Sequence, residues 1–213
     1  MKILLLWLLV LLGHAPATGP APVRVTFSPL TKVAYLAAKK AAVSTKPIVA
    51  FPLEKVRGRI VIPTVKGPNV FQDKGIGTDD IEQGEYLYQG YLTQFGYHVI
   101  EAHLYERTRW YLLNKQDIQL ALYATPVYSP NLRCLVVASA GIEYGVYPNE
   151  IQLFRFNNNQ WQLVWQLKPS VEPATWEPDE IDWLSDSTLL LKKKMWTGST
   201  PGNTFTYSKL TIR

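Results

Sequence analysis

The stretch EIQLFRFNNNQWQLVWQL (residues 150–167) decides the fold class of this chain. Two runs in which apolar and polar residues alternate, 150–156 and 160–167, flank three consecutive asparagines. Alternation with a period of two places one face of each run against a core, and asparagine tolerates the positive φ angles of tight hairpin turns. The stretch therefore predicts an antiparallel β-hairpin.

Similar runs extend from this hairpin in both directions. From about Pro47 to the end, short segments rich in β-branched and aromatic residues alternate with turn residues, which is typical of strands. The one convincing helix is 29–43, where alanine dominates and Val33 and Leu36 can share an apolar face with two alanines. We predict a mainly β fold of antiparallel sheets with one short N-terminal helix.

Two turn segments indicate that the strands form repeated units. The turn YSPN (128–131) leads into the apolar run 135–137, and the turn WLSD (183–186) leads into the run 189–191 in the same way. Residues 85–122 can form a third unit of similar length. Units of about 40 to 55 residues with several strands each are typical of β-propeller blades. Three blades are too few for an ordinary closed ring, so a β-sandwich or a barrel built from similar hairpins is the alternative.

The first residues have the layout of a secretory signal peptide. Lys2 precedes an unbroken apolar run of ten residues from Ile3 to Leu12, and the small residues 15–17 provide a cleavage site. The run is about half as long as a bilayer span. We expect a mature chain that is periplasmic or secreted, without a stable membrane anchor after cleavage.

The expected organisation has three parts. Residues 1–17 form the signal peptide, residues 18–55 a linker and helical lead-in, and residues 56–213 an antiparallel β domain. Such a domain is long enough to bury a core without disulfides. Cys134 is the sole cysteine, so an intrachain disulfide is excluded, and no local signature marks it as a catalytic thiol.

Charge and motif content exclude several classes of function. The formal net charge is +5, but the basic residues are scattered and the clusters 39–40 and 192–194 are too short for a nucleic-acid-binding arm. The sequence contains no G-x-S-x-G elbow, Walker loop, H-E-x-x-H helix, cysteine pair or dinucleotide fingerprint. We therefore predict no nucleic-acid partner, no cofactor and no metal site.

The segment YHVIEAHLYE (97–106) contains the most specific candidate for a catalytic or metal-binding site. In a strand, Glu101 and His103 point to the same face, while His98 points to the other. A carboxylate and an imidazole at this spacing can share a metal ion or act as an acid–base pair. The alternative is that they are simply polar residues on the solvated face of an amphipathic strand.

A second candidate is the connection GIEYGVYPNE (141–150). It concentrates carboxylates, an amide and aromatic rings in ten residues, and loops held by rigid sheets are where binding residues accumulate. The alternative is an ordinary long hairpin loop. The candidate ligand-binding residues of this connection are Glu143, Tyr144, Tyr147, Asn149 and Glu150.

Segments of aromatic and turn residues also carry a family resemblance. They are FQD (71–73), GYLTQFGYHVIEAHLYERTRWYLLN (90–114), PVYSPNLRCLVVAS (126–139), PNEIQLF (148–154) and the span from Trp165 to Trp183. Together they resemble an uncharacterised family of exported bacterial proteins, rich in β-structure, with propeller-blade-like repeats. The resemblance covers about residues 58–213, and it implies export and a β-fold without implying an activity.

The leading hypothesis is an exported, non-enzymatic module that binds a protein or a glycan through loops and aromatic residues. One alternative is a hydrolase or metal-dependent enzyme that uses Glu101 and His103, and another is an inhibitor or immunity-type protein. An open sheet edge can also pair with the edge of a second copy of the chain. We therefore also expect a homodimer that is joined through such edges.

Overall fold

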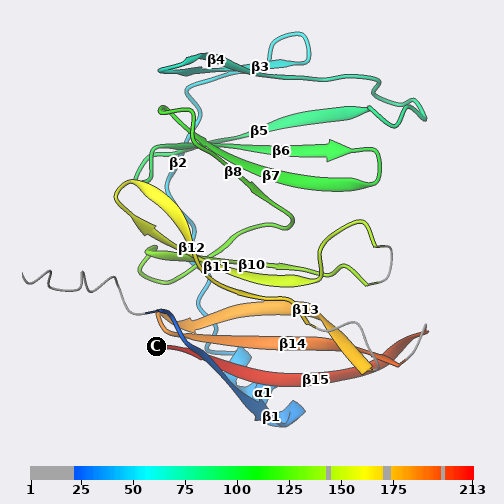
Figure 1. Cartoon of the computed structure of the whole chain (residues 1–213). Coiled ribbons are helices and arrows are strands. Elements are labelled where there is room, and N and C mark those ends of the chain that lie inside the picture. Colours follow the sequence, from blue (N-terminus) through cyan, green and yellow to red (C-terminus); the bar gives the residue numbers. More distant parts are fainter. Residues whose placement is uncertain (1–21, 143–144, 170–173, 198–199) are drawn as a thin grey trace, which may run out of the picture.

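The computed structural model describes residues 22–142, 145–169, 174–197 and 200–213 and confirms a mainly β, antiparallel fold with one short helix (Figure 1). The described elements are β1 (Val25–Leu30), α1 (Lys32–Lys39), β2 (Val49–Ala50), β3 (Arg59–Thr64), β4 (Gly67–Gln72), β5 (Gly84–Leu92), β6 (Tyr97–Leu104), β7 (Arg107–Asn114), β8 (Gln119–Leu122), β9 (Val127–Tyr128), β10 (Cys134–Ser139), β11 (Glu150–Asn157), β12 (Gln160–Leu167), β13 (Ala174–Ser185), β14 (Thr188–Thr197) and β15 (Thr200–Ile212).

The strands form four sheets that lie one above another, and from β3 to β15 they follow chain order, whereas β1 and β2 join later sheets (Figure 1). The hairpin sheet is β3-β4, the upper sheet is β2-β5-β6-β7-β8, the middle sheet is β12-β11-β10-β9 and the lower sheet is β1-β15-β14-β13. The predicted hairpin of residues 150–167 is the pair β11–β12. Within the described residues, these sheets form an open stack and do not close into a barrel.

Three apolar layers hold the stack together, one between each pair of neighbouring sheets. A strand inside the stack is covered on both faces, and its side chains alternate between these faces. Each such strand therefore contributes side chains to two apolar layers. On β10, Leu135 and Val137 join the layer below the upper sheet, whereas Cys134 and Val136 join the layer above the lower sheet. Burial of Cys134 raises the pKa of its thiol, which fits a core side chain.

The three larger sheets share the meander of the predicted units. The runs β5 to β8 and β9 to β12 each provide four consecutive strands, and β13 to β15 provide three. The fourth place in the lower sheet is taken by β1, which pairs with β15 from Val25–Ile212 to Leu30–Tyr207. The first strand of the described chain therefore completes the sheet formed by its last three strands.

The two turns that suggested a repeat contact each other directly. The backbone N–H of Asn131 donates to the carboxylate of Asp186 at 2.8 Å. The indole N–H of Trp183, which is fully buried, donates to the carbonyl oxygen of Val127 at 2.9 Å. Equivalent positions in successive units thus lie against one another, as stacked repeats require.

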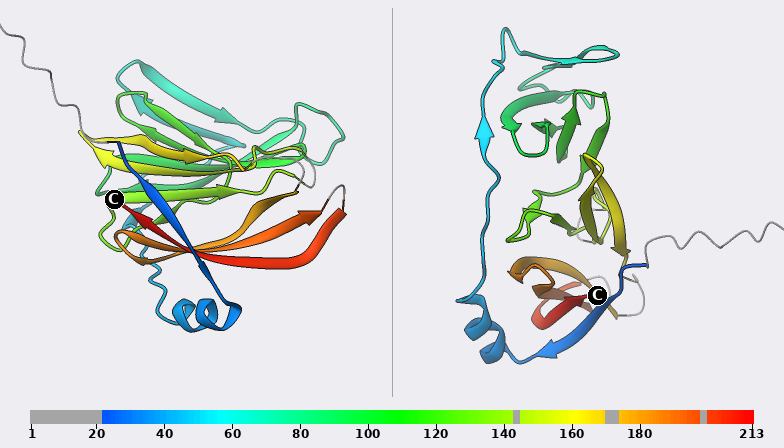
Figure 2. Two further views of the ribbon diagram at one scale, coloured as in Figure 1. Left: turned by 60° about the horizontal axis from the view of Figure 1, so that its bottom comes forward. Right: turned by 90° about the vertical axis from the view of Figure 1, so that its left-hand side faces the viewer.

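Residues 41–55, which we call the strap, run past the first strands of the three larger sheets (Figure 2, right). The strap pairs through Val43 with Trp183 on β13, through Thr45 with Tyr128 on β9, and through β2 with β5. It covers edges that would otherwise present free backbone hydrogen-bonding groups.

Helix α1 is shorter than the predicted range 29–43 and uses a different face. Pro29 lies in β1, whose pairing with β15 keeps it extended, and α1 follows the N-cap Thr31. Tyr35 is the buried residue and stacks on Tyr207 of the lower sheet at 4.6 Å. Val33 is 78 % exposed, so the predicted apolar face is wrong.

Candidate functional site

The strand pair β5–β6 separates the candidate polar residues onto two faces of the upper sheet. His103 Nε2 lies 3.0 Å from Glu101 Oε1, which places these two side chains together on one face, as predicted. His98 instead faces the hairpin sheet, where it lines a cavity with hairpin residues. The two faces must therefore be considered separately.

A β-bulge orients a third polar residue toward the Glu101–His103 pair. The pairing of β5 with β6 shifts between Tyr88 and Gly90, so Gln89 has no partner opposite it. Its amide donates from Nε2 to Glu101 Oε2 at 2.7 Å. Gln89, Glu101 and His103 thus form one chain of hydrogen bonds.

Next to this chain is a cavity of about 440 Å³ between the upper and middle sheets, which we call the Trp110 cleft. Gln89 and Trp110 line it from the upper sheet, Tyr128 lines it from the middle sheet, and strap residues 44–47 form a further wall. Trp110 lies directly opposite Glu101 in the β6–β7 register. The cleft therefore offers an aromatic face and an oriented amide in a space of the size usual for small ligands.

The described residues of the connection 141–150 are held by structural contacts. The hydroxyl of Tyr147 accepts the backbone N–H of Thr108 at 2.5 Å, which brings it near His103, the partner of Thr108 in the β6–β7 register. Asn149 donates to the carbonyl oxygen of Trp176 at 2.9 Å. Glu143 and Tyr144 lie outside the described residues.

Glu150 is buried in the middle sheet, where its carboxylate accepts from the Gln166 amide at 2.5 Å and lies 3.9 Å from Lys168 Nζ. Its contacts therefore belong to the β11–β12 hairpin. Among the side chains that the structure describes, no group of three His, Cys, Asp or Glu residues could hold a metal ion. The Glu101–His103 pair has no third ligand in that part of the chain.

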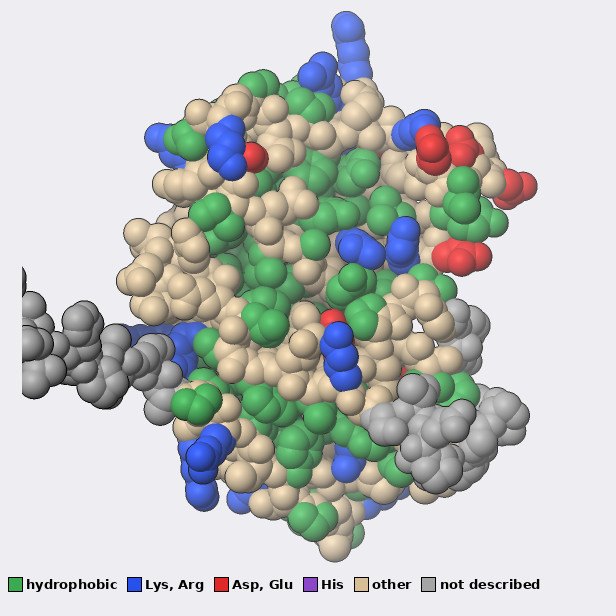
Figure 3. All heavy atoms as spheres, viewed as in Figure 1, with side chains coloured by type: hydrophobic (Ala, Val, Ile, Leu, Met, Phe, Trp, Pro, Cys, Tyr) green, Lys and Arg blue, Asp and Glu red, His purple; other side chains and the backbone are tan. Residues whose placement is uncertain are grey.

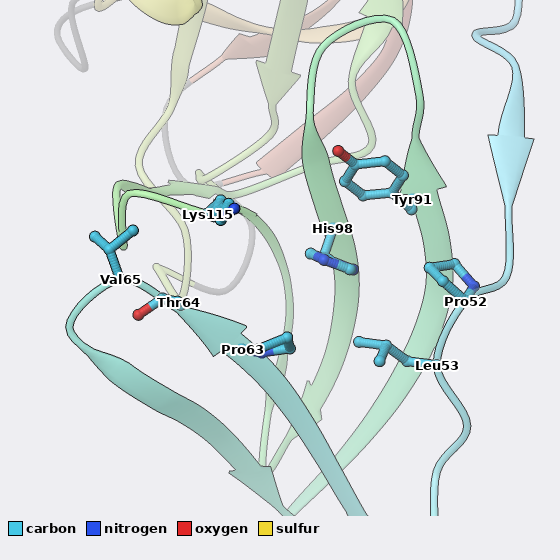
Figure 4. A pocket seen from close by; sticks show the side chains of 8 residues that line it. All are labelled: Pro52, Leu53, Pro63, Thr64, Val65, Tyr91, His98 and Lys115. Carbon is cyan, nitrogen blue, oxygen red and sulfur yellow. The ribbon is translucent and has the colours of Figure 1, made fainter.

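The opposite face of β5–β6 borders the His98 cavity, a space of about 540 Å³ between the upper sheet and the hairpin sheet (Figure 4). His98 lies at its centre, with Tyr91 from β5 beside it. The strap, the β3–β4 turn and the β7–β8 turn complete the walls. The lining residues are Pro52, Leu53, Pro63, Thr64, Val65, Tyr91, His98 and Lys115.

Aromatic neighbours hold the His98 imidazole in place. The Tyr88 hydroxyl lies 2.9 Å from His98 Nδ1, and the ring of Tyr91 lies 4.7 Å from the imidazole. Burial lowers the pKa of His98 from its ordinary value of 6.5 and raises the pKa of Tyr88 to about 12. The cavity therefore contains a neutral imidazole near pH 7.

We expect His98 to make the folded protein sensitive to acid. Below about pH 6.5 the unfolded chain protonates His98 while the folded chain resists protonation, so the free energy of unfolding should fall as pH decreases toward the folded pKa. Urea unfolding between about pH 7.5 and 5 should show this loss, and His98→Gln should reduce it. The exposed His103, changed to Gln, is the control; an equal reduction by both changes would contradict the assignment to His98.

On the face shown in Figure 3, Lys and Arg side chains are scattered from the top of the molecule to the bottom, whereas Asp and Glu side chains gather at the upper right. No family model matches the chain, and no curated protein or solved structure is significantly similar to it. The only described helix, α1, is too short to cross a membrane.

Local sequence patterns did not predict Gln89 and Trp110 as residues of the Trp110 cleft. Gln89 was not identified because its orientation depends on a bulge that ordinary alternation does not reveal. Trp110 lies in the run TRWYLLN, which predicts a strand, but the pairing of this strand beside Glu101 depends on the fold. Three other tryptophans are core side chains, with 8 % or less of their surface exposed: Trp161, Trp183 and Trp196.

Proposed function

We propose that the protein is an exported, non-enzymatic module that binds an uncharged saccharide in the Trp110 cleft. The observation that carries this proposal is the position of an indole ring and an oriented amide around one cavity. Saccharides present apolar C–H faces that pack on aromatic rings and hydroxyl groups that need fixed hydrogen-bonding partners. Export is inferred from the leader-like first 17 residues.

Glu101 acts in this proposal as a positioning residue. Its carboxylate accepts from Nε2 of Gln89, and no described group bonds Oε1 of the same amide, which can accept a hydrogen bond from a ligand hydroxyl. Nε2 of His103 lies 3.0 Å from the other carboxylate oxygen of Glu101, Oε1. A fixed amide loses less conformational entropy on binding than a mobile one, which favours a defined ligand.

The charge of the lining favours a neutral ligand. Lys46 is the one ionisable cation among the described lining residues, and it is exposed at the strap. The adjacent Glu101 carboxylate would repel an acidic ligand. These charges support a neutral sugar over an anionic one.

We expect Trp110→Leu and Gln89→Ala to weaken saccharide binding, each by about tenfold, because each removes one cleft contact. The test is a glycan array probed with the labelled mature chain, followed by calorimetric titration of the bound sugar. Trp165→Leu and Gln162→Ala are matched controls on β12, outside the cleft, and should bind like the parent protein.

Two results would overturn the proposal. One is a folded protein that binds no saccharide on the array, and the other is binding that both cleft variants retain in full. Consumption of the bound sugar, abolished by Glu101→Gln, would instead favour the hydrolase alternative, in which the Glu101–His103 pair performs acid–base chemistry.

A further inference from the structure

The His98 cavity has walls that are fixed by the fold. The backbone N–H of Val65 donates to the carbonyl oxygen of Lys115 at 2.9 Å, which joins the β3–β4 turn to the β7–β8 turn. On the other side, β2 of the strap pairs with β5. A cavity bounded by hydrogen-bonded segments is already formed before a ligand enters.

The lining of this cavity combines rings with a local positive charge. Pro52, Pro63 and Tyr91 surround the imidazole of His98 (Figure 4). Lys115 is the one formally charged residue among the eight lining residues, and none of the ion pairs of the described residues includes it. No described lining residue is acidic, so a negatively charged group meets no repulsion from the walls.

His98 adds a directed hydrogen-bonding group to this charge. Its Nδ1 is engaged by the Tyr88 hydroxyl, whereas no described protein group bonds Nε2. Because the Tyr88 phenol keeps its proton, it can donate to Nδ1 and leave the imidazole hydrogen on Nε2. In that tautomer, Nε2–H is a donor available within the cavity.

We propose that the His98 cavity binds small aromatic carboxylates. The ligand ring packs against Tyr91 and the prolines, and the carboxylate accepts hydrogen bonds from His98 Nε2 and Lys115 Nζ. This site lies on the opposite face of β5–β6 from the Trp110 cleft, so the inference does not depend on the saccharide proposal.

Binding should also couple to protonation of His98. The titratable groups that face the imidazole are Tyr88 and Tyr91 from β5 and Lys115 from the β7–β8 turn, while the strap and the hairpin contribute no charged lining residue. A carboxylate beside the ring would favour the imidazolium, so bound ligand should raise the pKa of His98 and binding should strengthen as pH falls.

The probes are benzoate, benzyl alcohol and acetate, each titrated into the mature chain by calorimetry and by NMR of the imidazole resonances. We expect saturable binding of benzoate, binding of benzyl alcohol weaker by about tenfold, and no measurable binding of acetate. A bound benzoate that leaves the His98 titration unchanged, or equal affinities for benzoate and benzyl alcohol, would overturn the assignment of the carboxylate.

Variants locate the site. Lys115→Gln, on an exposed turn, and His98→Gln should each weaken benzoate binding by about tenfold, with folding checked by circular dichroism. Lys209→Gln removes an exposed lysine from β15 and should bind like the parent. Trp110→Leu should also leave benzoate affinity unchanged, which separates this inference from the proposed function. Absence of benzoate binding to the folded parent, or full affinity in both cavity variants, would refute the site.

Discussion

Replacing Gly90 by alanine should destabilise the protein by about 3 kcal/mol or more and weaken ligand binding in the Trp110 cleft. Gly90 has φ +107°, and a Cβ atom there would lie 2.2 Å from Val49 Cγ1 and 2.9 Å from the carbonyl oxygen of Ala50. Both contacts belong to the strap, which must move away from β5 to admit the methyl group. Urea unfolding measures the first effect, and saccharide titration measures the second.

Gly67 provides a matched control for this substitution. It has φ +113°, close to the angle at Gly90, but nothing lies within 4 Å of the position that a Cβ would take. Gly67→Ala therefore adds similar backbone strain without displacing a neighbour and should cost roughly 1 to 2 kcal/mol. Equal losses of stability in the two variants would show that the contact between the strap and β5 does not matter.

Trp183→Ala should lower the free energy of unfolding by about 3 to 5 kcal/mol. The side chain is fully buried in the layer between the middle and lower sheets, and its indole N–H donates to the Val127 carbonyl oxygen at 2.9 Å. The substitution leaves a large cavity and an unsatisfied carbonyl group. Because each apolar layer of the described residues joins one pair of neighbouring sheets, hydrogen exchange should quicken more in β13, β14 and β15 than in β5, β6 and β7.

Trp183→Phe separates the two causes of this loss. Phenylalanine retains most of the buried apolar volume but cannot donate to Val127, so we expect a loss of about 1 to 3 kcal/mol. If the free energy of unfolding of Trp183→Ala differed by less than about 1 kcal/mol from that of the parent protein, the middle and lower sheets would not be coupled through this residue.

Local sequence patterns predicted the elements whose pairing is local. The β11–β12 hairpin follows from alternation around Asn157–Asn159, and two of these asparagines, Asn158 and Asn159, adopt positive φ angles of 49° and 59°. The comparison of the turns at 128–131 and 183–186 identified positions that meet through Asn131 and Asp186. Alternation along β6 also predicted that Glu101 and His103 share a face.

Features that join distant parts of the chain were not predictable in this way. The strap contains short polar and proline-rich stretches whose extended form depends on the sheet edges beside it. Strand β1 contains Pro29 and becomes a strand because β15 provides a partner edge. The Trp110 cleft requires the strap, the bulge at Gln89 and the packing of two sheets, so single-strand periodicity cannot reveal it.

The pairing of β1 with β15 also has a consequence for synthesis. A growing chain exposes residues 25–30 well before their partner residues 207–212 are made. On the ribosome, the lower sheet therefore lacks both β15 and its edge strand β1 until residues 207–212 have been made. A chain stalled before residue 207 should remain sensitive to protease at residues 25–30, whereas a chain that includes all of β15 should be protected there.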